Sequence, residues 1–273
     1  LNVGLELLGA GRRIADKMRW ELSAVLLGHK VGPLVEELAA HGADKVYLAD
    51  APILSIYRTD AYALVLESLI KRHRPSIFLL GGTAIGMDLA PRVAAKVSTG
   101  LSAHCVNLDV DKDGCLIANV PAFGGSVMAS IACAKHRPQM ATIPAGFMRK
   151  QEYDPSRKAS VEKVDVNVTE SQVRTKVVEV VTRKSETRPI EQAETVVCGG
   201  FGVGNKENWK IVEDLAVILG GSVGATRPAC DEGWAKLEEQ MVGQSGKTVH
   251  PKLYIGIGVS GAAHHLIGIE DSK

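Results

Sequence analysis

Short apolar runs alternate with segments of helical periodicity over the first hundred residues of the chain. Three runs have the length and unbroken apolarity of buried strands: Leu22–Gly28 (LSAVLLG), Lys45–Asp50 (KVYLAD) and Ser76–Gly82 (SIFLLGG). The segments that follow them place apolar residues at helical spacing, and two of these segments end at the helix-stopping residues Gly42 and Pro75. This alternation predicts a doubly wound parallel sheet with right-handed connections.

Beyond Gly100 the pattern changes to strand-like runs joined by turn residues. The runs are Leu101–Asp111, Cys115–Phe123, Ser126–Ala134 and Gln139–Phe147. They predict added or antiparallel strands that complete a nucleotide-binding-like α/β domain. The stretch from Arg149 to Arg188 is polar, with one further strand-like run at Val173–Lys184, and we place the domain boundary in its second half.

The strand–helix alternation restarts at Glu194 and predicts a second α/β domain with a parallel sheet. We assign residues 1–186 to the first domain and residues 190–273 to the second. A parallel sheet with so few strands would leave apolar edges bare, so the second domain looks truncated. We expect the native chain to continue beyond Lys273, and an opening strand or targeting segment could precede Leu1.

Composition narrows the class of protein. Hydrophobic residues make up 45% of the 273 residues but aromatic residues only 4%, which favours aliphatic strands covered by alanine-rich helices. A net charge of +1 indicates no nucleic acid and no anionic membrane surface as partner, and no apolar run is long enough to span a membrane. The five cysteines form no CxxC pair, so they give no support for a metal site and are interpreted as buried free thiols.

Three glycine-rich segments carry the candidate chemistry. Gly256–Gly261 (GIGVSG) matches the dinucleotide fingerprint and follows a predicted strand, although a tight turn that packs a helix on a sheet explains it equally well. Gly199–Trp209 is a second strand-to-helix turn, with Asn205 as its expected N-cap. Val242–Thr248 (VGQSGKT) is not a phosphate-binding P-loop, because Met241 stands where that motif needs glycine.

These three turns, together with the segment Gly224–Trp234 (GATRPACDEGW), are predicted to lie at the carboxyl ends of parallel strands, where open α/β sheets bind ligands. Two phosphate-friendly turns and a polar loop favour a large nucleotide over a small metabolite. The chain has no nucleophile elbow, no HExxH and no paired carboxylates at useful spacing, so hydrolysis is not indicated. His264 and His265 stand on the turn that faces the expected ligand and are candidates for binding it.

Several long stretches of the chain resemble the alpha subunit of electron transfer flavoproteins. They are Gly81–Ala103, Pro121–Met148, Val223–Trp234 and Val242–Lys273. The segments RPQMAT and VGQSGKTVHPKLYI within them are far more specific than a glycine fingerprint alone. The resemblance implies a heterodimer with a beta subunit that holds AMP or a second FAD, and an FAD site in the second domain of this chain.

The resemblance also implies the biological role. It implies an electron carrier, not a substrate-transforming enzyme, that shuttles electrons between flavin dehydrogenases, such as acyl-CoA dehydrogenases, and another redox partner. An electron-bifurcating complex that uses NADH and ferredoxin is one form of this role. The expected location is the bacterial or archaeal cytoplasm, or the mitochondrial matrix if the chain is eukaryotic.

Carried over by position, the resemblance implies contacts between FAD and residues of three segments. The residues are Thr226, Arg227, Val242, Gly243, Gln244, Ser245, Gly246, Ser260, Gly261, Ala262, Ala263, His264 and His265. Arg227 would favour the reduced, anionic flavin as a permanent cation. Ser245 would offer a hydroxyl near the flavin N5, Gln244 would offer amide donors, and His265 would donate to the pyrimidine edge of the ring.

The chain departs from the family pattern at four positions. Phe201 stands where the family usually has arginine, and His264 stands where it has glutamine. Met241 replaces a glutamine, and Ser245 replaces a threonine. These departures bear on the flavin potential and on partner choice.

Two other classes of function stay open from the residues themselves. A nicotinamide-dependent dehydrogenase could use the GIGVSG turn for NAD, although no convincing acid–base pair accompanies it. A nucleotide sensor could use the first domain alone. We further expect the stretch Lys184–Pro189 to act as a hinge, and the strands Cys115–Phe123 and Ser126–Ala134 to carry a large partner interface of at least about 2,000 Å².

Overall fold

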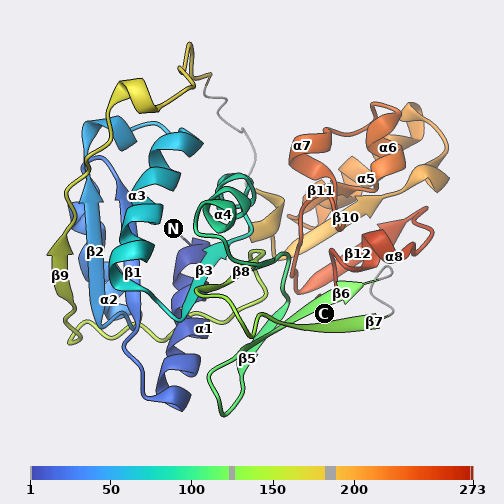
Figure 1. Ribbon diagram of the computed structural model, residues 1–273. Helices are drawn as coiled ribbons and strands as arrows, with labels where there is room; N and C mark the ends of the chain where they lie inside the picture. The colour runs from blue at the N-terminus through green and yellow to red at the C-terminus, as the bar shows by residue number, and fades with distance from the viewer. Residues whose placement is uncertain (1, 123–126, 182–188, 271, 273) are drawn as a thin grey trace. The chain divides into compact units, whose positions relative to one another are not determined.

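The computed structural model describes residues 2–122, 127–181, 189–270 and 272 (Figure 1). The chain divides into two compact units, Leu1–Ala122 with Met128–Val180, and Phe123–Val127 with Val181–Lys273. The predicted hinge falls almost wholly on residues 184–188, which lie outside the described residues. Each unit is an α/β body with its own core.

The first unit opens with the expected strand–helix alternation. Its elements to residue 102 are α1 (Asn2–Met18), β1 (Ser23–Gly28), α2 (Val35–Ala40), β2 (Lys45–Asp50), α3 (Thr59–His73), β3 (Ile77–Gly81), α4 (Ala84–Lys96) and β4 (Leu101–Ser102). The three apolar runs thus form the three predicted strands. The helices bury their apolar faces, as α3 does with Val65, Leu66 and Leu69.

The predicted sheet of the first unit is present as two parallel sheets of three strands each. Their orders are β1-β2-β9 and β3-β8-β4, with β9 (Ser160–Lys163) and β8 (Gln139–Ile143) contributed by later parts of the chain. Of the two alternatives expected for Gln139–Phe147, the added strand is present and the antiparallel one is not. All five residues of β8 are buried, because this strand lies between β3 and β4 and is parallel to both.

The remaining strands of this unit form a separate sheet, as the change of pattern predicted. Its order is β5-β6-β7, from β5 (Asn107–Val110), β6 (Leu116–Ala122) and β7 (Val127–Ala132), and β5 pairs with β6 in antiparallel register. Residues of β7 are mostly exposed, including Val127, Met128 and Ile131.

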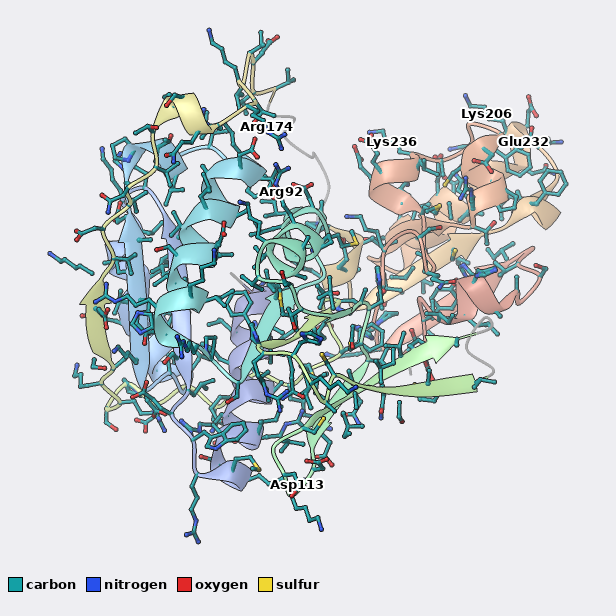
Figure 2. All side chains as sticks on the ribbon, viewed as in Figure 1. Arg92, Asp113, Arg174, Lys206, Glu232 and Lys236 are labelled. Carbon is teal, nitrogen blue, oxygen red and sulfur yellow. The ribbon has the colours of Figure 1, made fainter. Side chains whose placement is uncertain are left out.

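The polar stretch after residue 149 was only partly predicted. The strand expected at Val173–Lys184 is absent over its described part, residues 173–181, and a strand forms instead at β9, which adds to the edge of β2. Val178 and Val180 are 94% and 62% exposed, so these valines find no sheet to cover them. Arg174 anchors the start of this segment, because Arg174 and Arg92 both pair with the buried carboxylate of Asp60 (Figure 2).

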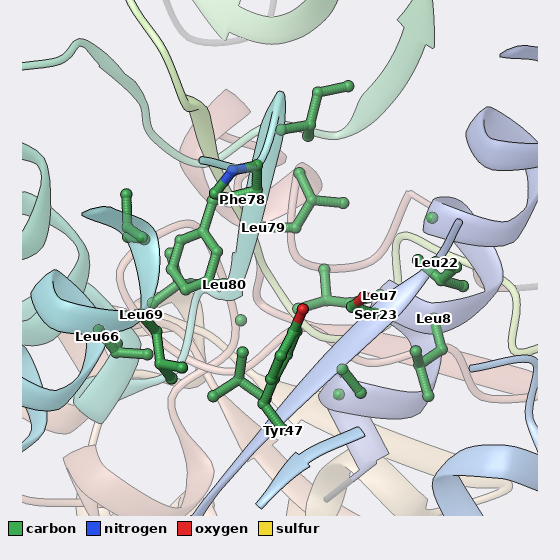
Figure 3. A pocket seen from close by; sticks show the side chains of 18 of the residues that line it. Leu7, Leu8, Leu22, Ser23, Tyr47, Leu66, Leu69, Phe78, Leu79 and Leu80 are labelled. Carbon is green, nitrogen blue, oxygen red and sulfur yellow. The ribbon is translucent and has the colours of Figure 1, made fainter. Parts of the chain in front are cut away.

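A cavity of about 590 Å³ lies inside the first unit, between β1 and β3. These two strands are the end strands of their sheets in the described part of the chain. Leucines of α1 and α3 and the ring of Phe78 line the space, as Figure 3 shows, and Tyr47 and Ser23 bring the nearest hydroxyl groups. The Tyr47 hydroxyl is already bonded to His73 Nδ1 at 3.2 Å. The wall of the cavity is therefore mainly apolar, with polar side chains such as Glu21, Ser76 and Thr83 among its lining residues.

The second unit has one parallel sheet of order β11-β10-β12. Its elements are β10 (Thr195–Gly199), α5 (Lys206–Ile218), β11 (Ser222–Ala225), α6 (Arg227–Asp231), α7 (Leu237–Gln240), β12 (Leu253–Ile257) and α8 (Ala263–Leu266). The side chain of Trp209 on α5 packs so close to β10 that a Cβ at Gly199 would stand 2.3 Å from its ring. Asn205 caps α5 as predicted, accepting from the Asn208 N–H at 2.8 Å.

Candidate functional site

Three of the four segments predicted to meet at one sheet edge follow the carboxyl ends of strands in the second unit, whereas the fourth, Val242–Thr248, follows α7. Gly200 comes after β10, Thr226 after β11, and Gly258 after β12. Because the three strands are parallel, their carboxyl ends form one edge of the sheet. This arrangement follows from the pattern of short apolar runs ending in glycine-rich turns.

The glycines of the GIGVSG turn serve two different purposes. At Gly258 (φ +63°) a Cβ would stand 2.6 Å from the Gly202 carbonyl carbon, and the Gly202 N–H donates to Gly258 O at 3.0 Å. Gly258 therefore packs the β12 turn against the β10 turn. Gly261 (φ +72°) has no atom within 4 Å of its Cβ position, so the space beside it is open.

The open part of this turn presents backbone donors to solvent. Residues 260–264 are exposed, and Ala263 begins the short helix α8. Within the described residues, the N–H groups of Ser260, Gly261, Ala262 and Ala263 have no intramolecular hydrogen-bond acceptor. A row of unpaired N–H groups at the start of a helical turn suits a phosphate or carbonyl oxygen of a ligand.

The loop at Val242–Gly246 extends the sheet edge from β11. Met241 bridges Ala225, and the Val242 N–H donates to Ala225 O at 2.9 Å. The loop closes when the Gly243 N–H donates to Lys247 O at 3.0 Å, which leaves Gln244, Ser245 and Gly246 exposed at its tip. At Gly246 a Cβ would stand 2.3 Å from Met241 O, so only glycine fits this tight turn.

The loop and the short helix α8 are brought together by several contacts. The Gln244 N–H donates to His264 O at 2.7 Å, and Gln244 Oε1 lies 2.6 Å from His264 Nδ1. Gly243 has φ +140°, and a Cβ there would stand 2.6 Å from His264 O. The sequence predicted these two segments as separate parts of one edge, and the structure joins them directly.

The imidazole of His265 points into the protein. The residue is 6% exposed, with Nδ1 3.0 Å from Val242 O and Nε2 2.6 Å from the Tyr254 hydroxyl. Burial lowers the pKa of His265, against a smaller opposite effect of the Val242 carbonyl. The role expected from the resemblance, a donor to the flavin ring, would require this ring to give up an internal hydrogen bond.

Arg227 and Thr226 occupy the edge position that the sequence predicted. Thr226 is buried, and its N–H donates to Gly199 O at 2.9 Å, which fixes the start of α6. The Arg227 side chain is 67% exposed and lies 3.7 Å from Asp231, one turn along α6. The guanidinium is therefore held only by a loose surface pair and is available to a ligand at this edge.

Phe201, the residue at the expected arginine position, belongs to an aromatic group. Its ring stacks on Trp234 with centroids 5.8 Å apart, and Trp234 packs on Trp209 at 6.1 Å. Phe201 is 57% exposed. The turn after β10 therefore offers an aromatic surface in place of a cation.

Two residues of the site were missed from the sequence. Tyr254 lies inside β12, where the run KLYIGIG indicated only a buried strand, and Cys198 lies in β10 with its Sγ 4.0 Å from His265 Nε2. A tyrosine within an otherwise aliphatic strand was the available signal, since a buried tyrosine hydroxyl requires a partner.

The donor set fits FAD. Exposed backbone N–H groups, the open space beside Gly261, and the amide and hydroxyl of Gln244 and Ser245 match a ligand with phosphates, hydroxyls and carbonyl oxygens. Among the described residues there is no cluster of three metal-ligating side chains. In the same residues no helix is long and apolar enough to cross a bilayer.

Comparisons with known proteins agree with this donor set. The family model of the electron transfer flavoprotein domain matches residues 2–169, and that of the electron transfer flavoprotein FAD-binding domain matches residues 189–270. The chain is 44% identical over 272 residues to the electron transfer flavoprotein subunit alpha of Thermoanaerobacterium thermosaccharolyticum, covering 100% of this chain and 82% of the relative.

Two other relatives carry different names. Protein FixB of Clostridium saccharobutylicum is 48% identical over 272 residues, covering 99% of this chain and 80% of the relative. A protein of Anaerotignum propionicum named acryloyl-CoA reductase electron transfer subunit beta is 38% identical over 301 residues, covering 100% of this chain and 82% of the relative.

Proposed function

Because the chain belongs to the electron transfer flavoprotein family as an alpha subunit, we propose that it holds FAD at the carboxyl edge of β10, β11 and β12. The family function is electron transfer, and FAD is its cofactor. The observation that carries the site is the direct contact between the Val242–Gly246 loop and His264 of α8, which brings the donors of the loop and those of the turn before α8 to one edge.

The residues of this edge have different roles in binding the cofactor. The exposed N–H groups of Ser260–Ala263 hold oxygen atoms of the cofactor, and Gln244 and Ser245 orient it with an amide and a hydroxyl. Thr226 fixes the start of α6, so that Arg227 stands at the rim as a permanent cation. Bound FAD supplies the chemistry of accepting and releasing electrons.

Alpha subunits of this family pair with a beta subunit. We place this partner on β7, whose outward residues include Val127, Met128 and Ile131 at 50%, 53% and 41% exposure. Three large apolar side chains in one short strand are costly to leave in water, and an obligate interface of about 2,000 Å² or more covers such residues. A full-length alpha chain that sediments as a stable monomer would contradict this placement.

The further partners follow from the resemblance and from one relative. We assign AMP or a second FAD to the beta subunit, a flavin dehydrogenase to the donor side, and NADH with ferredoxin to a bifurcating complex. The name of the Anaerotignum propionicum relative, an electron transfer subunit of acryloyl-CoA reductase, supports a role beside an acyl-CoA-processing enzyme. The bacterial sources of the relatives support a cytoplasmic location.

The test of the function is the visible absorption spectrum of the full-length alpha chain purified with its beta subunit. The expected result is a flavin spectrum that bleaches on anaerobic reduction and recovers on oxidation. Flavin binding is expected to be lost or weakened in Gly261→Val, because the valine side chain would fill the open space beside Gly261. Gly32→Val on the first unit is the control and should leave flavin binding unchanged. A colourless complex that binds NAD would replace this function by a nicotinamide-dependent dehydrogenase.

A further inference from the structure

The cavity of the first unit is a slot that runs along two strands. Its lining follows β1 over residues 23–27 and β3 over residues 77–81, so it extends over almost the whole length of both strands. Figure 3 shows Leu66 and Leu69 of α3 on one side of this space and Leu7 and Leu8 of α1 on the other. The slot therefore has two strands and two apolar helix faces as its walls.

Each of these two strands has a sheet partner on one side only. β1 pairs with β2 and β3 pairs with β8, and in the described part of the chain neither has a second strand neighbour. The N–H and C=O groups of a strand point to both of its sides, so half of them face the slot without a ladder partner. Among the described residues, no turn bonds the backbone of residues 23–27 or 77–81 on that side either.

The leucines and the unpaired backbone groups together define the kind of occupant. An aliphatic ligand would cover the leucines but would leave the backbone groups unpaired, at about 1–3 kcal/mol for each buried group. Water would pair the backbone groups but would leave the leucines uncovered. An extended peptide with apolar side chains satisfies both, because its own N–H and C=O groups point sideways and its side chains point to both faces.

Helix α1 indicates which peptide this is. Its residues Leu7, Gly11 and Ile14 all line the slot, so the helix lies along it, and the chain then passes into β1, which borders the slot. A helix in this position covers the strand that precedes it and the strand that follows it, in a right-handed β-α-β unit. The first strand of that unit belongs before α1. The relatives have room for such a segment, since this chain spans 82% and 80% of the lengths of two of them.

We propose that the residues directly before Leu1 in the full-length protein form a strand in this slot, parallel to β1 and hydrogen-bonded to both β1 and β3. This strand joins the two three-stranded sheets into one sheet of seven, in which it lies between β9-β2-β1 and β3-β8-β4. A strand buried on both faces in this way has a continuous apolar sequence. The inference concerns the first unit and is independent of FAD binding.

The test compares the full-length alpha chain with a chain that begins at Leu1, each assembled with its beta subunit. Deuterium uptake is measured for peptides of β1 and β3, with β2 and β8 as strands paired on both sides and β4 and β9 as end strands. In the full-length complex β1 and β3 are expected to exchange as slowly as β2 and β8, and about tenfold more slowly than the end strands. In the chain that begins at Leu1 they are expected to exchange as fast as end strands.

A synthetic peptide provides the matched control. The peptide has the sequence of the residues directly before Leu1 and is added to the complex of the shorter chain, next to a scrambled peptide of the same composition. The native sequence is expected to restore slow exchange of β1 and β3, whereas the scrambled sequence is expected to leave it fast.

Three outcomes would overturn the proposal. The first is exchange of β1 and β3 at the rate of the end strands in the full-length complex, which decides the matter even if the shorter chain does not assemble. The second is slow exchange in both chains, since β1 and β3 would then be protected without the added strand. The third is an apolar small molecule released from the full-length complex by organic extraction together with fast exchange, which would make that ligand the occupant.

Discussion

The first unit contains a cavity of about 590 Å³ and the second contains an exposed binding edge, and the two differ in the groups that line them. The cavity between β1 and β3 is lined mainly by leucines and Phe78, and the Tyr47 hydroxyl at its wall is already bonded to His73. The edge in the second unit has exposed N–H groups, an amide, a hydroxyl and a guanidinium. Volume therefore does not locate the cofactor site in this chain, whereas unpaired polar groups on a fixed backbone do.

The largest effect is expected where the binding edge has no spare room. Gly243→Ala must adopt φ near +140° and bring a Cβ within 2.6 Å of His264 O, which forces the loop away from α8. Strain of about 1–3 kcal/mol at this position, if all of it opposes binding, weakens FAD binding by roughly fivefold to 150-fold. The measurement is the FAD dissociation constant of the assembled heterodimer.

The matched control for this change is Gly220→Ala. Gly220 also has positive φ (+61°) and belongs to the second unit, but nothing lies within 4 Å of its Cβ position. Gly220→Ala introduces the strain of a non-glycine residue at positive φ but no steric clash. It is therefore expected to lower the free energy of unfolding and to leave FAD affinity unchanged. Equal loss of affinity in both variants would show that the crowding at Gly243 does not set the geometry of the edge.

A second change should damage the first unit and spare the edge. Gln139 is 1% exposed, and its amide accepts from the Leu116 N–H at 2.7 Å and donates to Gly114 O at 3.0 Å. Gln139→Met leaves both backbone groups unpaired and lowers the free energy of unfolding by about 1–3 kcal/mol. Denaturant unfolding measures this loss.

The exposed residue Gln192, on the second unit, supplies the control as Gln192→Met, which should leave stability nearly unchanged. FAD affinity of the folded Gln139→Met complex should match wild type. A loss of affinity that follows the loss of stability would mean that the two units are less independent than their separate cores indicate.

The two units should also respond to acid at different pH. Burial holds the pKa of folded His265 below the usual value of a free imidazole, about 6.5, so the unfolded chain takes up the proton first. The second unit therefore loses stability as the pH falls below about 6.5. Hydrogen exchange of peptides from β10 and β12 measures this, with a slope of at most about 1.4 kcal/mol per pH unit from one proton. In His265→Asn this part of the slope disappears.

Asp44 provides the contrasting case in the first unit. Burial alone would raise its pKa, but the Leu22 N–H together with Arg12 and Arg157 outweigh that and lower the pKa below 3.8. Its contribution to stability is therefore present above that pH and is lost only as the pH falls through the folded pKa. First-unit peptides that open already between pH 6.5 and 5 would contradict the comparison.

The smallest effect is expected at the rim of the edge. Arg227→Ala removes an exposed cation, so it should lower the flavin potential while FAD still binds through the backbone donors. A severalfold change in the one-electron equilibrium corresponds to ~20–40 mV. Lys210→Ala is the control, because Lys210 is a similarly exposed cation with an i,i+4 acidic partner on α5. Equal potentials for the two variants would remove Arg227 from the group that tunes the flavin.

The local pattern of apolar and polar residues was sufficient to predict most strands and the position of the binding segments at one sheet edge. Apolar runs of five to seven residues predicted β1, β2, β3, β10, β11 and β12, and parallel strands of one sheet bring their carboxyl ends to one edge. The sequence alone thus indicated Thr226, the Val242–Gly246 loop and the Ser260–His265 turn as neighbours. The resemblance to electron transfer flavoproteins, which the family comparisons confirm, added the cofactor that such an edge would hold.

Contacts distant along the chain decided the rest. β8 and β9 joined parallel sheets from the later part of the first unit, and Val173–Val181 formed no strand, because pairing depends on which edge is free in space. The inward orientation of His265 was likewise invisible in the HH pair, since its partners are Tyr254, 11 residues away, and Val242, 23 residues away. Periodicity reports which face of an element is apolar, but only the tertiary structure determines which hydrogen-bond partner a buried polar side chain meets.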